Sequence, residues 1–180
     1  MSTYGLLMAA PVLGLLVCAA VVDLRSRRIP NWLTFSLVLS GIAQSFTHGA
    51  LTTPGMSLAG FAVGFALPFT LFFLNAVGGG DVKLLAGLGA WFGPVAVFQI
   101  FVLEALLGAI LVIAQATATG RMKVLLRNSA VLAVNLAHVK DVGLDHVKAT
   151  GVSSRSIDRP IPYAVPVLAA VLILMARSMN

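Results

Sequence analysis

The chain has 180 residues, of which 59% are hydrophobic and 10% are charged, and its net charge is +6. Soluble domains average roughly 45–50% apolar and about 25% charged residues, so this composition argues against a soluble enzyme, a nucleic-acid-binding domain or a disordered tail. The only cysteine, Cys18, lies within an apolar run, which excludes an intrachain disulfide and any multi-cysteine zinc site. The composition is typical of a polytopic membrane protein.

Charges, turns and Gly/Pro positions divide the chain into apolar segments. A hydrocarbon core of about 30 Å takes roughly 20 helical residues, so the apolar stretch 84–120 is too long for one helix. Gly93-Pro94 is its natural break, because proline ends a preceding helix and glycine permits a turn. We therefore expect an all-α fold with one membrane-embedded domain over 1–180 and about six transmembrane helices, at 4–22, 32–46, 56–77, 82–92, 95–116 and 161–176.

The positions of the basic residues predict the orientation of these helices. With the N-terminus outside, 11 of the 12 Lys and Arg residues fall on the inner side, and Arg177 alone falls on the outer side. Both termini are then outside. The inner loop, about 121–159, carries apolar residues at helical spacing (Met122, Leu125) with basic residues off that stripe (Arg121, Lys123). This pattern predicts a cytoplasmic amphipathic helix that meets anionic lipid, although a solvated linker helix has the same spacing.

Acidic residues are rare inside membranes because charge is costly there. Three of them fall in or beside the apolar segments: Asp23, Asp81 and Glu104. Each also has a purely structural interpretation. Asp23 could pair with a neighbouring arginine, and Asp81 could cap the fourth span. Glu104 could be a protonated acid that is hydrogen-bonded to a neighbouring helix, and nothing around it forms a pattern.

Asp23 and Asp81 are more informative as a pair, because the orientation places both at the inner ends of their spans. Two carboxyl groups at one depth can share a proton, so that one acts as base on a water and the other protonates a carbonyl oxygen. The proton belongs to the pair, and neither role is assigned to one residue. The glycines at 78–80 allow positive φ and close approach of an extended peptide substrate; a flexible hinge is the alternative.

Three blocks of the sequence together resemble the type IV prepilin peptidases. Gly78-Gly79-Gly80-Asp81-Val82-Lys83 is similar to the G-x-G-D segment of that family. Asp23, followed by Arg28-Ile29-Pro30-Asn31, resembles its first aspartate block, and Ile161-Pro162-Tyr163 resembles the proline–tyrosine segment that opens its last helix. The blocks occur in the family's order and spread over most of the chain.

The resemblance implies an aspartic endopeptidase of the bacterial cytoplasmic membrane that cleaves the short leader of a prepilin on the cytoplasmic side. The termini would then be periplasmic. The catalytic residues would be Asp23 and Asp81, with supporting roles for Gly78, Gly80, Lys83, Arg28, Pro30 and Asn31. The expected partners are the prepilin leader with its apolar helix, and anionic lipid at the basic face; nucleic acid is not expected.

The chain departs from the larger members of that family, which have an extra cytoplasmic domain with two Cys-x-x-Cys pairs and also methylate the new pilin N-terminus. Here the loop after the first span is only 23–31. We therefore expect no zinc, no cofactor and no methyltransferase activity, as in the short peptidases of tight-adherence (Flp-type) pilus systems. The alternatives are an ion-coupled transporter, an inert pilus or secretion assembly subunit, and a preflagellin-type or presenilin-like G-x-G-D protease.

Overall fold

The computed structural model describes residues 3–48, 50–73, 77–137 and 162–179. Within these ranges the chain forms six helices and no strand, which confirms the predicted all-α class. The helices are α1 (Thr3–Ser26), α2 (Asn31–Gln44), α3 (Pro54–Phe73), α4 (Gly79–Ala118), α5 (Met122–Ala137) and α8 (Ala164–Met179).

Three of these helices have the length and apolar composition needed to cross a membrane: Ala9–Ser26 of α1, α3 and α4. The others that pack with them are shorter, since α2 has 14 residues and α8 has 16. At 1.5 Å per residue they are about 21 and 24 Å long, below the roughly 30 Å of a hydrocarbon core. Six complete crossings therefore stay a prediction.

Large apolar side chains cover much of the outer surface. Trp32 and Phe35 on α2, and Leu106 and Ile110 on α4, are each more than half exposed. Soluble monomers rarely expose contiguous apolar patches of this kind. The surface therefore suits a hydrocarbon environment.

The long helix α4 is interrupted at Gly93, which has φ 83° and ψ 176° and is followed by Pro94. Glycine reaches positive φ at little cost, whereas other residues do so rarely. Proline has no N–H to donate to the preceding turn. The interruption falls at the break that the sequence indicates.

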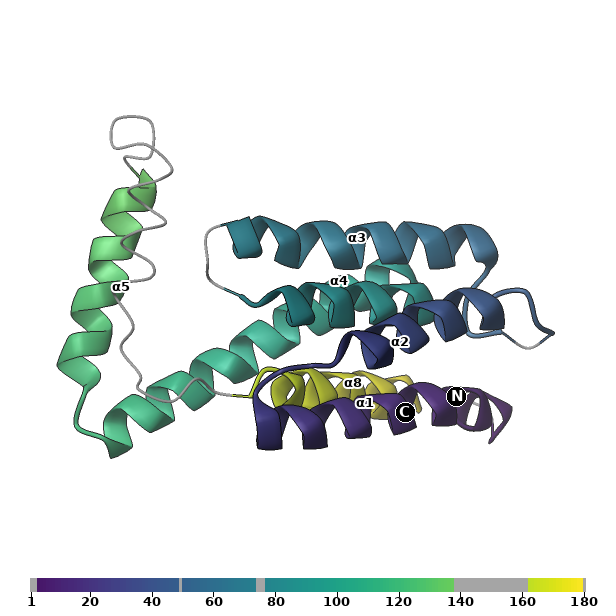
Figure 1. Ribbon diagram of the computed structural model, residues 1–180, viewed down its shortest axis with the longest axis horizontal. Helices are drawn as coiled ribbons and strands as arrows, with labels where there is room; N and C mark the ends of the chain where they lie inside the picture. Colours follow the sequence, from purple (N-terminus) through teal and green to yellow (C-terminus); the bar gives the residue numbers. More distant parts are fainter. Residues whose placement is uncertain (1–2, 49, 74–76, 138–161, 180) are drawn as a thin grey trace.

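Contacts of α3 show that α4 turns back on itself there. A Cβ built on Gly64 would lie 2.4 Å from the carbonyl oxygen of Leu85 and 3.1 Å from Cγ2 of Val97. In one continuous helix, 12 residues would separate those two positions by about 18 Å. Residues 79–92 and 94–118 are therefore two segments that run in opposite directions, as Figure 1 shows.

The helices other than α5 run roughly along the long axis of the molecule (Figure 1). The first segment of α4 is central: α3 packs on it from one side and α2 from another. The helices α1 and α8 lie side by side, and α8 also contacts α4. Both termini lie at one end, so α1 ends, and α2, α4 and α8 begin, at the opposite end.

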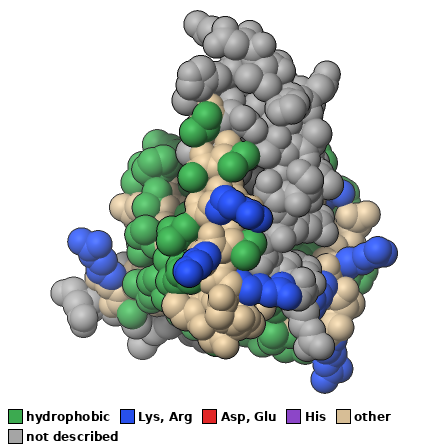
Figure 2. All heavy atoms as spheres, turned by 90° about the vertical axis from the view of Figure 1, so that its left-hand side faces the viewer, with side chains coloured by type: hydrophobic (Ala, Val, Ile, Leu, Met, Phe, Trp, Pro, Cys, Tyr) green, Lys and Arg blue, Asp and Glu red, His purple; other side chains and the backbone are tan. Residues whose placement is uncertain are grey.

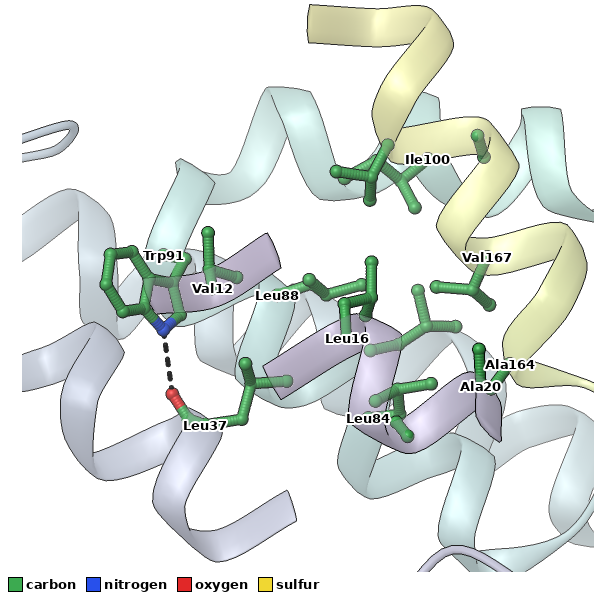
Figure 3. Close-up of a cluster of buried hydrophobic side chains, with 14 of the residues drawn as sticks. Val12, Leu16, Ala20, Leu37, Leu84, Leu88, Trp91, Ile100, Ala164 and Val167 are labelled. Carbon is green, nitrogen blue, oxygen red and sulfur yellow. Dashed lines mark hydrogen bonds between the residues drawn. The ribbon is translucent and has the colours of Figure 1, made fainter. Parts of the chain in front are cut away.

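Aliphatic side chains of four helices meet in the centre of this bundle (Figure 3). Leu16 of α1, Leu37 of α2, Leu88 of α4 and Val167 of α8 are completely buried. The indole of Trp91 joins α4 to α2, because its Nε1 donates a hydrogen bond of 3.0 Å to the carbonyl oxygen of Leu37. The buried cluster fixes how the helix ends are placed relative to one another.

Helix α5 stands apart from the bundle at the end that carries the basic residues (Figure 1). Figure 2 looks onto this end and shows several Lys and Arg side chains, with no acidic side chain visible among the residues described. The exposed Lys and Arg residues at this end of the molecule form what we call the basic face: Arg25, Arg27, Arg28, Lys83, Arg121, Lys123 and Arg127. Arg177 lies in the last turn of α8, near the other end. The rest of the expected inner loop, 138–159, lies outside the described residues.

Candidate active site

Asp23 lies near the C-terminal end of α1 and is 5% exposed. Its Oδ2 accepts a hydrogen bond of 2.9 Å from the backbone N–H of Ala164, the first residue of α8. The first N–H groups of a helix have no partner within the helix, and the helix dipole there favours a negative charge. The carboxyl group of Asp23 is therefore held by the N-terminus of a helix about 140 residues further along the chain.

Asp81 is half-buried in the first turn of α4. Its Oδ2 accepts a hydrogen bond of 2.9 Å from the backbone N–H of Gly78, the residue that caps the helix. This is the reciprocal half of a capping box, in which the third residue of a helix reaches back to the cap. The structural interpretation of Asp81 as a capping residue is therefore present in the fold, and it leaves the other carboxyl oxygen, Oδ1, for chemistry.

The glycines before Asp81 do not use the left-handed backbone that the sequence allows. Among the described residues, positive φ occurs at Arg27, Gly93 and Gly120, while Gly78 is extended with φ −83° and ψ 156°. A Cβ on Gly80 would lie 3.4 Å from Cβ of Ile29, an ordinary contact distance, so the start of α4 lies directly beside the turn after α1. The freedom to reach positive φ is thus not used at 78–80, and the start of α4 lies in van der Waals contact with another part of the chain.

That contact brings the 27–31 turn onto the start of α4. Arg27 directly follows α1 and has φ 53°, and its N–H donates a 2.8 Å hydrogen bond to the carbonyl oxygen of Asp23. Pro30 then caps α2 with extended backbone. Asn31 Oδ1 accepts a 2.9 Å hydrogen bond from Lys83 Nζ. The turn that follows the first aspartate thus contacts the helix that carries the second.

The structure therefore brings together most of the residues expected at the site. Asp23, Asp81, Gly78, Gly80, Pro30, Asn31 and Lys83 all lie at the end of the bundle where α2, α4 and α8 begin. Arg28 is exposed, as Asn31 and Lys83 are, and its backbone carbonyl accepts a hydrogen bond from Ser26 Oγ within the turn after α1.

A third acid lies in the same place. Glu104 is 3% exposed, and its Oε1 accepts a 2.5 Å hydrogen bond from the hydroxyl of Tyr163. Asp81 interacts electrostatically with both Asp23 and Glu104, so the three carboxyl groups form one cluster.

The sequence contains a signal for this position of Glu104. Once the chain turns back at Gly93, Asp81 stands 12 residues before the turn and Glu104 stands 11 residues after it. At 1.5 Å per residue both are about 17–18 Å from the turn, and therefore at the same depth. The interpretation of Glu104 as an acid hydrogen-bonded to a neighbouring helix agrees with its bond to the residue before α8.

Metal ligands are not gathered at this site. Among the residues described, no group of three or more His, Cys, Asp and Glu side chains could hold a metal ion. Cys18 is exposed on α1. Within the described part of the chain, every buried side-chain nitrogen and oxygen has a hydrogen-bond partner. What the cluster offers is carboxyl groups fixed by backbone N–H groups and a tyrosine hydroxyl.

Several known peptidases are similar in sequence to part of this chain. A prepilin leader peptidase/N-methyltransferase of Xanthomonas campestris pv. campestris is 36% identical over 104 residues, which are 53% of this chain and 36% of that protein. A preflagellin peptidase of Methanocaldococcus jannaschii is 42% identical over 82 residues, 43% of this chain and 34% of that protein. A prepilin leader peptidase/N-methyltransferase of Aeromonas salmonicida is 31% identical over 114 residues, which are 59% of this chain and 39% of that protein.

The chain thus matches little more than a third of the length of these curated relatives. No solved structure matches it. The model of the type IV leader peptidase family matches residues 10–113, which is more than half of the chain and includes Asp23, Asp81 and Glu104. The chain therefore belongs to the type IV leader peptidase family.

Proposed function

We propose that this protein is an aspartic endopeptidase that removes the short leader peptide of a type IV prepilin, with Asp23 and Asp81 as its catalytic residues. The observation that carries the proposal is the pair of carboxyl groups at one end of an apolar bundle, each held by one backbone N–H at a helix N-terminus. Family membership supports leader-peptide processing as the reaction.

The chemistry needs the two carboxyl groups in different protonation states. The ionised one takes a proton from a water molecule as that water adds to the scissile carbonyl carbon, and the protonated one gives its proton to the carbonyl oxygen. The tetrahedral intermediate then collapses, and the leaving amine takes a proton from the pair. No covalent intermediate forms. Two carboxyl groups that share one proton carry a single negative charge between them, and neither residue is named as the base.

The substrate would meet this pair from two sides. Its polar leader lies at the basic face, and its apolar helix enters laterally from the bilayer. A groove of about 570 Å³ between α2 and α3 suits that helix, because Phe35, Phe61 and Phe65 line it while Asn31 and Lys83 close its inner end. Lys83 and Asp81 both lie in the first two turns of α4, so the inner end of this groove is at the end of the bundle that carries the carboxyl groups.

The proposal includes six transmembrane helices with both termini in the periplasm and the basic face toward anionic lipid of the cytoplasmic leaflet. The short 23–31 turn and the single cysteine support a Flp-type peptidase that needs no metal or cofactor and has no methyltransferase activity. The similarity to a preflagellin peptidase keeps a preflagellin as the second candidate substrate.

The test is cleavage of a co-expressed Flp-type prepilin, and separately of a preflagellin, in membranes. Asp23→Asn and Asp81→Asn keep the shape of the side chain, and each should lower the cleavage rate by at least about a hundredfold, since general acid–base catalysis contributes about 10²–10⁴-fold. Asp145→Asn removes a carboxyl group from the predicted cytoplasmic loop and is the matched control.

Cleavage that persists in both folded variants would disprove the assignment of the two aspartates. Absence of cleavage by the wild-type protein, together with proton flux that depends on Glu104 in liposomes, would favour an ion-coupled transporter. Absence of both would leave an inert assembly subunit.

A further inference from the structure

The hydrogen bond between Glu104 and Tyr163 joins two parts of the chain that the proposed reaction does not use. Glu104 lies in the second segment of α4, and Tyr163 immediately precedes α8. We propose that Glu104 and Tyr163 are positioning residues: by fixing the start of α8, they hold the backbone N–H of Ala164 on the carboxyl group of Asp23. This inference rests on the proposed function, in which Asp23 is catalytic.

The contacts form one continuous path. Glu104 Oε1 accepts from the Tyr163 hydroxyl at 2.5 Å, Tyr163 is bonded covalently to Ala164, and the Ala164 N–H donates to Asp23 Oδ2 at 2.9 Å. The side chain of Ala164 is completely buried. A shift of the Tyr163 ring therefore moves the N–H that orients the catalytic carboxyl group.

A helix start needs such an anchor, because the first turn of a helix has few internal hydrogen bonds and opens easily. At the start of α8, the N–H of Val167 donates a long hydrogen bond of 3.5 Å to the carbonyl oxygen of Tyr163. The bond to Glu104 ties this turn to α4, the same helix that carries Asp81. Through it, the two segments of α4 hold both catalytic carboxyl groups.

A buried acid is a costly way to join two helices if joining them is its only role. A carboxyl group in an apolar surrounding loses its hydration, so apolar side chains of similar volume often serve at least as well. Only six acids occur in the chain, and three of them, Asp23, Asp81 and Glu104, lie in this one cluster. Glu104 also stands at the same depth as Asp81, since the two lie 11 residues after and 12 residues before the turn at Gly93.

The experiment compares variants at both ends of the hydrogen bond. Tyr163→Phe removes the donor, Glu104→Leu removes the acceptor, and Glu104→Gln keeps a carbonyl oxygen that can accept from the tyrosine. Ser57→Ala is the matched control, because it removes another buried hydroxyl whose 2.7 Å bond to the carbonyl oxygen of Ala90 joins α3 to α4 away from the cluster.

With purified protein and prepilin in detergent micelles, kcat of Tyr163→Phe and of Glu104→Leu should fall about 10- to 100-fold with KM nearly unchanged, since a displacement of about 1 Å costs about a hundredfold. Glu104→Gln should restore most of the kcat that Glu104→Leu loses. Ser57→Ala should lose stability but keep the kcat of its folded fraction. The inference is wrong if Tyr163→Phe has the kcat of Ser57→Ala, or if Glu104→Gln is as slow as Glu104→Leu.

A second measurement does not depend on peptidase activity. Hydrogen exchange of the peptide that covers the start of α8 should be at least about tenfold faster in Tyr163→Phe than in the wild type or in Ser57→Ala, because the first turn opens more often. Unchanged exchange would overturn the positioning role even if the protein cleaves no prepilin. Failure of the wild type to cleave prepilin, with the faster exchange present, would instead overturn the proposed function.

Discussion

Gly89→Ala should strongly destabilise the bundle, because α3 and α4 touch backbone to backbone at this residue. A Cβ built on Gly89 would lie 2.0 Å from the carbonyl oxygen of Gly60, and a Cβ on Gly60 would lie 2.1 Å from that of Gly89. Small residues allow such close approach between helices in membranes. Because no carbon–oxygen contact without a bond is shorter than about 3.0 Å, the two helices must separate by about 1 Å.

The structure gives the size of the effect. Overpacking of a tight contact costs about 1–3 kcal/mol. The same separation would lengthen the 2.7 Å hydrogen bond from Ser57 Oγ to the carbonyl oxygen of Ala90 beyond hydrogen-bond distance, which costs about 1 kcal/mol more. We therefore expect a loss of about 2–4 kcal/mol in the free energy of unfolding.

Gly108→Ala is the matched control, because Gly108 lies in the same helix and a Cβ there would have no neighbour within 4 Å. Both substitutions gain the same helix propensity of about 1 kcal/mol, so their difference isolates the contact. The assay is reversible unfolding in mixed detergent micelles, followed by circular dichroism. Equal stability of Gly89→Ala and Gly108→Ala would refute the close packing of α3 on α4.

Three further predictions concern the turn, the polar link and the groove. Gly93→Ala should lose about 2 kcal/mol against Gly14→Ala in the same unfolding assay, because φ 83° and ψ 176° fall in a region that is essentially restricted to glycine and costs other residues about 1–3 kcal/mol. Equal stability would contradict the reversal of α4. Lys83→Met breaks the exposed hydrogen bond to Asn31, so the free energy of unfolding should fall by less than about 1 kcal/mol and the rate of prepilin cleavage by less than about threefold. A hundredfold slower cleavage would instead show that Lys83 takes part in the chemistry. A photo-crosslinking amino acid in place of Phe35, which lines the groove, should capture uncleaved prepilin in the Asp81→Asn variant. The same amino acid in place of the exposed Leu106 is the control and should not capture it. Equal capture at both positions would exclude the groove as the entry site.

Features that depend on neighbouring residues could be predicted from the sequence. The break at Gly93-Pro94 is one, since both residues act on the local backbone. The position of Asp81 in the first turn of a helix is another, because glycines precede it and an apolar run follows it.

Features that depend on helix rotation could not be predicted in this way. The glycines at 60 and 89 are visible in the sequence, but their contact requires that both helices turn these faces toward each other. The bond from Tyr163 to Glu104 joins residues 59 positions apart, with a long polar loop between them. No pattern of neighbouring residues predicts which face of α4 contacts the start of α8.

The short helices have a consequence for the lipid around them. Both α2 and the first segment of α4 have 14 residues, and they pack together through Trp91 and Leu37. Each is about 21 Å long, so a bilayer with a core of about 30 Å meets a hydrophobic mismatch of about 9 Å on this side of the protein. Lipid adapts to a short helix by thinning. Thinning would draw headgroups and water toward the end of the bundle where Asp81 lies, so the membrane itself would help to supply the water that the proposed reaction consumes.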